Sequence, residues 1–132
     1  TDPHAKAHAR TVCAEMHAGF GALRGAMPMN LVKSYAARDW AADVTKDITR
    51  VQNLWRDCRT RFGGDGDFLF GAFTIADAMY APVVTRFKTY AIELDDVCNA
   101  YADAVLALPA MQTWTAEAAA EPWVIEKYGP PE

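Results

Sequence analysis

The sequence has few cysteines, no excess of basic residues and no long apolar run. Its three cysteines, Cys13, Cys58 and Cys98, are widely spaced and lie in apolar helical patterns. Such a set argues against a disulfide framework and fits a reducing compartment, so we expect a cytoplasmic protein. No apolar run approaches the roughly 20 residues that a membrane span needs, and the N-terminal residues lack a signal-peptide core. No membrane partner is therefore expected.

The charge balance argues against polyanionic partners. The formal net charge is -4, the sequence pI is about 5.3, and the basic residues are scattered among acidic ones. Nucleic acids and anionic membrane surfaces attract proteins through clustered Lys and Arg side chains. We therefore expect neither nucleic acid nor an anionic membrane as a partner.

Strand patterns and internal repeats are also lacking. No segment alternates apolar and polar residues, whereas helical spacing of apolar residues recurs along the chain. A length of 132 residues suits one domain that buries its own core. We predict an all-α fold, a helical bundle of about five helices, in a single domain that spans residues 1–132.

Caps, breakers and apolar periodicity place the five helices. They are predicted from Pro3 to Ala26, from Val44 to Phe62, from Ile75 to Tyr90, from the Asp95-Asp96 cap to Leu108, and from Pro109 to Ala120. Met27 and Met29 follow the first helix in a loop and are expected to be exposed. The aromatic tail from Pro122 to Tyr128 is expected to fold back over the bundle, and residues 129–132 are expected to fray.

Thr74 and Asp77 form the sharpest local signal in the chain. A Thr followed three residues later by an acidic side chain, just before an apolar run, is typical of a capping box. The Thr74 hydroxyl is expected to accept from the backbone N–H of Asp77, and the Asp77 carboxylate from the backbone N–H of Thr74. Such a cap is worth about 1 kcal/mol. We expect the helix that begins at Ile75 to be central and the least exposed.

Residue types that bind metals or act as nucleophiles occur here only in weak patterns. The segment Gly63-Gly-Asp-Gly-Asp67 lacks the residues of a phosphate or calcium loop and predicts a turn. His4 with His8, and Cys13 with His17, supply two ligands each, and nothing supplies the other two at a recognisable spacing. We therefore predict no metal site. Cys13 with His17 as base is possible on spacing, but a thiol in an apolar stripe is usually inert. Trp40 and Trp123 lie off the apolar stripes and are candidates for a pocket.

Three segments carry a family resemblance. They are Ala14-Glu-Met-His-Ala-Gly-Phe20 with its exit Pro28-Met-Asn30, Phe68-Leu-Phe-Gly-Ala-Phe-Thr-Ile-Ala-Asp-Ala-Met-Tyr-Ala-Pro82, and Leu108-Pro-Ala-Met-Gln-Thr-Trp114 with Glu121-Pro-Trp123. Their order along nearly the whole chain resembles the C-terminal helical domain of the bacterial glutathione S-transferases. In that family a Ser/Thr-x-x-Asp box, here Thr74 and Asp77, starts the central helix. That box identifies the structure and not the catalysis.

The resemblance implies a role for this chain within a two-domain enzyme. In that family an N-terminal thioredoxin-like domain binds glutathione, the co-substrate, and supplies the residue that activates its thiol. No βαβ pattern for such a domain occurs here, so this chain alone is predicted to be inactive, with no catalytic residue and no cofactor of its own. Its implied role is to form the wall of a pocket for a small hydrophobic electrophile and part of a homodimer interface.

Family position also implies which residues face that pocket. They lie on the second half of the first predicted helix, at Met16, His17, Phe20 and Arg24, and Trp123 from the tail is a candidate lid. A second hypothesis stays open, because the same helical fold serves in translation-factor and synthetase complexes as a stand-alone protein-contact module without catalytic activity.

Overall fold

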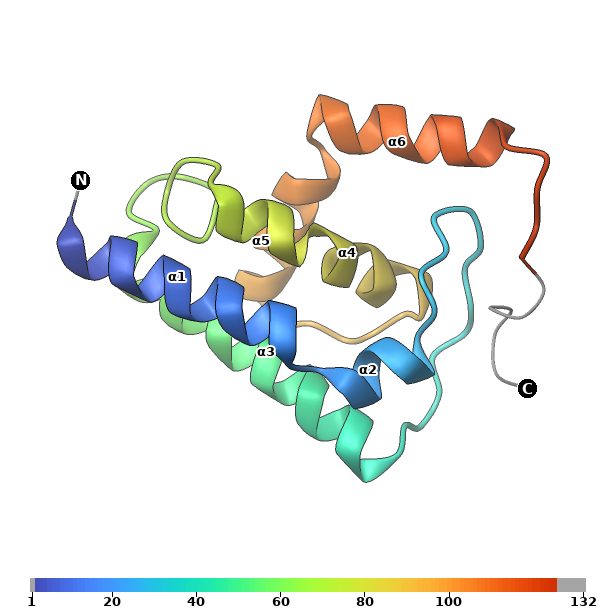
Figure 1. Cartoon of the computed structure of the whole chain (residues 1–132), viewed down its shortest axis with the longest axis horizontal. Helices are drawn as coiled ribbons and strands as arrows, with labels where there is room; N and C mark the ends of the chain where they lie inside the picture. The colour runs from blue at the N-terminus through green and yellow to red at the C-terminus, as the bar shows by residue number, and fades with distance from the viewer. Residues whose placement is uncertain (1, 126–132) are drawn as a thin grey trace.

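The computed structural model describes residues 2–125 and is built of helices in that range. Figure 1 shows the arrangement, in which α1 lies along α3, α4 occupies the middle, and α6 extends from the bundle. The six described helices are α1 (Pro3–Ala18), α2 (Gly21–Ala26), α3 (Ala42–Phe62), α4 (Ile75–Thr89), α5 (Asp96–Leu106) and α6 (Pro109–Ala120). Apart from isolated bridges between Phe68 and Gly71 and between Phe70 and Ala72, no β pairing occurs within residues 2–125. The all-α prediction is confirmed.

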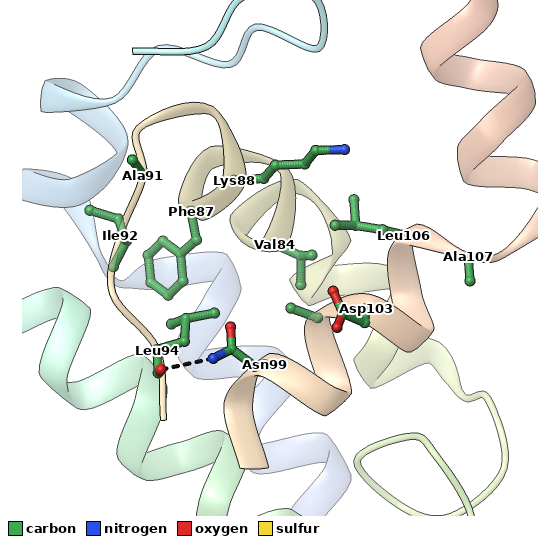
Figure 2. Close-up of a pocket in the computed structure, with 11 residues that line it drawn as sticks. Val84, Phe87, Lys88, Ala91, Ile92, Leu94, Asn99, Asp103, Leu106 and Ala107 are labelled. Carbon is green, nitrogen blue, oxygen red and sulfur yellow. Dashed lines mark hydrogen bonds between the residues drawn. The ribbon is translucent and has the colours of Figure 1, made fainter. Parts of the chain in front are cut away.

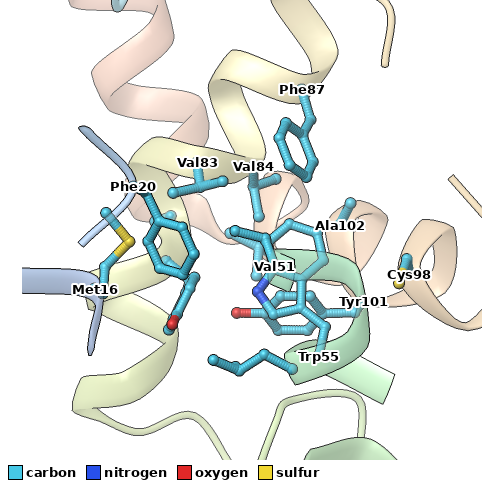
Figure 3. Packing of buried hydrophobic residues seen from close by; sticks show 14 of the residues in the cluster. Met16, Phe20, Val51, Trp55, Val83, Val84, Phe87, Cys98, Tyr101 and Ala102 are labelled. Atoms are coloured by element: carbon cyan, nitrogen blue, oxygen red, sulfur yellow. The ribbon is translucent and has the colours of Figure 1, made fainter. Parts of the chain in front are cut away.

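The core forms where α4 meets its neighbours. This helix contacts α1 on one side and α5 on another, and α3 contacts α2 and α5. The largest fully buried side chains include Trp55, Tyr80, Tyr101 and Phe87, and Figure 3 shows this packing around Trp55. The Trp55 ring lies 4.9 Å from that of Tyr101 and 5.4 Å from that of Phe87. Aromatic side chains from three helices therefore hold α3, α4 and α5 together.

The capping box at the start of α4 is present. The backbone N–H of Thr74 donates to Asp77 Oδ2 at 2.7 Å, and the Thr74 hydroxyl accepts from the backbone N–H of Ala76 at 3.3 Å. Asp77 is fully buried and also accepts from the backbone N–H of Leu69 at 3.0 Å. This carboxylate thus caps α4 and fixes the preceding loop. Nine of the 15 residues of α4 are buried, which confirms that it is a central helix.

The first helix differs from the prediction, because α1 ends at Ala18 and α2 begins at Gly21. Gly19 is extended, with φ -104° and ψ -171°, and Phe20 adopts the left-handed conformation with φ 60°. The prediction of one helix from Pro3 to Ala26 was wrong at this point. The break turns the Phe20 side chain into the core, where it is 6% exposed. Burial of a large aromatic ring outweighs the cost of a left-handed residue.

The remaining helices match the sequence pattern closely. α3 buries Val44, Ile48, Val51, Trp55 and Cys58 as its periodicity predicted, and Leu54 in addition. Asp95 caps α5 by accepting from the backbone N–H of Cys98 at 2.9 Å. α6 begins at Pro109, the expected first position, and ends at Ala120. Met27, predicted to be exposed, is fully buried, because the loop after α2 folds against α4. Arg86 Nε anchors this loop by donating to the Met27 carbonyl at 2.8 Å.

The tail does not cover the bundle over its described part. Pro122, Trp123, Val124 and Ile125 are all exposed, and Trp123 is 76% exposed. The prediction that this segment packs back was wrong for residues 122–125, while the rest of the tail, including Tyr128 and residues 129–132, lies outside the described residues. Of the helices described, none is both long and apolar enough to cross a membrane.

Candidate functional site

The exposed surface of α1 and α2 holds two of the predicted pocket residues. His17 and Arg24 are exposed on either side of the break, together with Ala14, Ala18, Gly21 and Gly25. These six residues are called here the α1–α2 outer face. A Cβ atom placed at Gly21 or at Gly25 would meet no other atom within 4 Å. The small residues therefore leave the helix backbone accessible to a ligand, which could approach it between the imidazole of His17 and the guanidinium of Arg24.

Met16 and Phe20 lie on the opposite side of the same segment. They are 7% and 6% exposed and belong to the main core cluster, part of which Figure 3 shows with both side chains drawn. Met16 follows Val12 at helical spacing on the buried stripe of α1, and Phe20 is turned inward by the break. The structure therefore separates the predicted set into two core residues and two surface residues. Met16 and Phe20 support the outer face from beneath.

Positive charge gathers near α2. Arg86 donates to the carbonyl groups of Met27 at 2.8 Å and Pro82 at 3.0 Å. Burial lowers the pKa of the Arg86 guanidinium, and the like charge of Arg24 lowers that pKa further. Two guanidinium groups thus interact at the C-terminal side of the outer face. An anionic group that approached Arg24 would relieve this repulsion.

Cys13 is a poor nucleophile in this setting. Burial raises the pKa of its thiol, and the negative charge of Asp77 raises that pKa further. The reactive species of a cysteine is the thiolate, so a raised pKa disfavours attack at neutral pH. His17, its predicted partner, is exposed on the outer face. Across residues 2–125, no group of three His, Cys, Asp or Glu side chains is arranged to hold a metal ion.

The two tryptophans proposed for a pocket have different surroundings. Trp123 is exposed on the tail, so the described structure does not bring it together with His17 and Arg24. Trp40 is half-buried, with its ring edge-on to Tyr90 at 5.8 Å and the Arg38 guanidinium 4.5 Å above it. Trp40 therefore anchors the long loop between α2 and α3 against the end of α4.

A groove that the sequence did not predict lies between α4 and α5 (Figure 2). It has a volume of about 460 Å³ and none of the five predicted pocket residues lines it. Its lining residues are Val84, Phe87, Lys88, Ala91, Ile92, Leu94, Asn99, Ala102, Asp103, Leu106 and Ala107. The spacing of Asn99, Ala102, Asp103 and Leu106 marks one face of α5 in the sequence. That spacing gives no sign that the neighbouring α4 leaves this face open.

Comparison with known proteins connects this architecture to a family. A family model described as "Glutathione S-transferase, C-terminal domain" matches residues 36–117, which include α3, α4 and α5 entirely. The match begins after α2, so the α1–α2 outer face lies outside it. A search of curated proteins finds no match.

Proposed function

The chain belongs to the glutathione S-transferase C-terminal domain family, and from this premise we propose that it forms the electrophile-binding wall of a two-domain glutathione transferase. In the proposed enzyme a thioredoxin-like domain binds glutathione and activates its thiol. The helical chain binds a small hydrophobic electrophile and contributes part of a homodimer interface, in the cytoplasm. The three cysteines and the acidic surface are compatible with that setting.

The observation that carries the proposal is the openness of the α1–α2 outer face. Gly21 and Gly25 leave space above the helix, and His17 and Arg24 flank that space with polar groups. A flat apolar ligand can lie against glycine backbone, where a larger side chain would hold it away. Arg24 stabilises negative charge that develops on an electrophile or its leaving group during thiol attack.

The chain itself supplies no activated nucleophile in this proposal. The pKa of the Cys58 thiol and that of the Cys98 thiol are each raised to about 12 by burial, and that of the Cys13 thiol is also raised. A thiol with a raised pKa is protonated at neutral pH. The division of labour therefore assigns binding to this chain and thiol activation to its partner domain. Trp123 is exposed on the tail, so its proposed role as a cover requires the tail to close over the outer face when the electrophile binds.

Kinetics with glutathione and 1-chloro-2,4-dinitrobenzene test the proposal. We expect turnover by the complete gene product and none by residues 1–132 alone. In the complete protein, Gly21→Leu fills the open space and should raise KM for the electrophile about tenfold while KM for glutathione stays unchanged. Arg24→Ala should lower kcat. The matched control is Lys46→Ala, on the exposed side of α3, which should change neither constant.

Two results would overturn the proposal. Conjugation by the isolated chain would show that it holds its own activated thiol site. Absence of turnover in the complete protein, together with stable capture of another protein by the chain, would favour the stand-alone contact module instead.

A further inference from the structure

We propose that the groove between α4 and α5 is a binding site for a small zwitterion with an apolar body, such as an apolar amino acid. The groove lies on helices other than α1 and α2, so this site is independent of the electrophile wall proposed above. None of its lining residues belongs to the α1–α2 outer face.

The floor of the groove is apolar and built on rigid elements. Val84 and Phe87 are each 1% exposed and come from the buried side of α4, and Ala102 of α5 is 7% exposed. Leu106 and Ile92 complete the apolar lining as half-buried side chains. Figure 2 shows the Phe87 ring directed into the space between α4 and α5. A volume of about 460 Å³ lies within the range of small-molecule sites in proteins.

The rim carries hydrogen-bond acceptors on the α5 side. Asn99 and Asp103 stand four residues apart on α5, so both project toward the groove. Asn99 Nδ2 donates to the Leu94 carbonyl at 2.9 Å, which fixes the amide and leaves Oδ1 as an acceptor. A protonated amine has three donors, which match the Asn99 oxygen and the Asp103 carboxylate.

A cation stands on the α4 side of the rim. Lys88 is exposed, and its side chain extends along the groove above Val84 and Leu106 in Figure 2. Neither Lys88 nor Asp103 belongs to any ion pair within residues 2–125. By contrast, Arg56 pairs with Asp95 and Arg50 pairs with Glu15. The groove therefore presents one free charge of each sign across an apolar floor.

The two rim charges and the floor define the ligand class together. A carboxylate pairs with Lys88, an ammonium group pairs with Asp103, and a ring or branched chain packs on the half-buried side chains of Leu106 and Ile92. Purely apolar ligands would leave both rim charges unused, and singly charged ligands would use one. An apolar amino acid satisfies all three surfaces.

Binding of L-phenylalanine, followed by amide chemical shifts of the chain, tests this site. We expect saturable shifts at Ala102, Asp103 and Leu106. The amine-free analogue 3-phenylpropionate and the carboxylate-free analogue 2-phenylethylamine should each bind about fivefold more weakly. Glycine, which lacks the apolar body, should produce no saturable shift.

Two variants assign the charges separately. Asp103→Asn should weaken L-phenylalanine and 2-phenylethylamine about fivefold and leave 3-phenylpropionate unchanged, whereas Lys88→Met should weaken L-phenylalanine and 3-phenylpropionate only. Both side chains are exposed, so the thermal midpoint should not move. Lys46→Met on α3 is the control and should leave every affinity unchanged. The proposal is overturned if no ligand saturates up to its solubility limit, or if the two variants affect the three ligands alike.

Discussion

The Asp47 carboxylate, on α3, accepts a hydrogen bond from the backbone N–H of Leu23 at 3.1 Å and so caps the first turn of α2. The residue at the N-cap position of α2 is Phe20, which has no side-chain acceptor. Because the first N–H groups of a helix have no partner inside it, a neighbouring helix supplies the cap. This bond joins residues 24 positions apart and holds α2, which carries part of the outer face, against α3.

Loss of the Asp47 acceptor should destabilise the fold. We expect Asp47→Ala to lower the free energy of unfolding by about 1 kcal/mol, the usual cost of removing a helix cap. Asp47→Asn retains one carbonyl acceptor and should cost about half as much. Urea unfolding of both variants beside the neighbouring Lys46→Ala checks this, and an equal loss in all three would contradict the assignment.

Removal of the Asp77 carboxylate should cost more than removal of the Thr74 hydroxyl. Asp77 accepts from the backbone N–H groups of Leu69 and Thr74 and from the Thr74 hydroxyl, and it is fully buried. Asp77→Ala leaves buried donors without partners and should cost about 3 kcal/mol. Thr74→Ala should cost about 1 kcal/mol. Thermal or urea unfolding measures both, and wild-type stability in either variant would show that the box does not support α4.

Alanine substitution should have opposite effects on stability at Gly19, in the helix break, and at Gly25, on the outer face. A Cβ atom at Gly19 would lie 2.7 Å from the Glu15 carbonyl oxygen, whereas Gly25 has open space. Gly19→Ala should therefore destabilise the chain by about 1–3 kcal/mol. Gly25→Ala lies within α2 and should stabilise it by about 0.5–1 kcal/mol. If both changes act in the same direction, the break does not depend on this close contact.

Alkaline pH should weaken the fold through its buried thiols. Burial raises the pKa of Cys58 and that of Cys98 from 9.0 to about 12. The unfolded chain releases these protons first, so stability is fully present below pH 9 and falls as the pH rises toward 12. Each thiol contributes a slope of about 1.4 kcal/mol per pH unit in that window. Urea titrations at several pH values measure the slope.

Burial also raises the pKa of the Tyr80 and Tyr101 hydroxyls, and cysteine variants separate the thiol contribution from theirs. Cys58→Ala should remove its own share of the alkaline slope, although it also lowers stability at neutral pH by leaving a small cavity. Cys98→Ala should act in the same way. An unchanged slope in both variants would assign the alkaline loss to other groups.

Local signals predicted the helices well, because their physical causes lie within a few residues. The Thr74 and Asp77 box, the Asp95 cap and Pro109 each mark a helix start that the structure contains. The buried stripe of α3 also follows from spacing alone. These features depend on backbone donors and on the helical period, which the sequence displays directly.

The pocket residues were harder to predict, because burial depends on which elements pack together. Met16, His17, Phe20 and Arg24 were assigned to one wall, but the break places Met16 and Phe20 in the core and leaves His17 and Arg24 outside. In a helix that continued through Gly19, these four residues would have lain close together on one side. The groove between α4 and α5 likewise depends on tertiary packing, because the two helices are in contact but their side chains leave a space between them.

Capping and periodicity are local and encoded residue by residue, so the sequence predicted the starts of α1, α4, α5 and α6 and the central position of α4, and three of its segments indicated the family. It did not predict the start of α2. The break in the first helix, the burial of Met27 and the groove that Lys88 shares with Asp103 are apparent only in the folded molecule. These outcomes come from long-range packing, in which burial of Phe20 and the cap from Asp47 outweigh local helix preference. Local helix preference can be read from neighbouring residues, whereas the burial and capping that override it form only when segments distant in the sequence pack together.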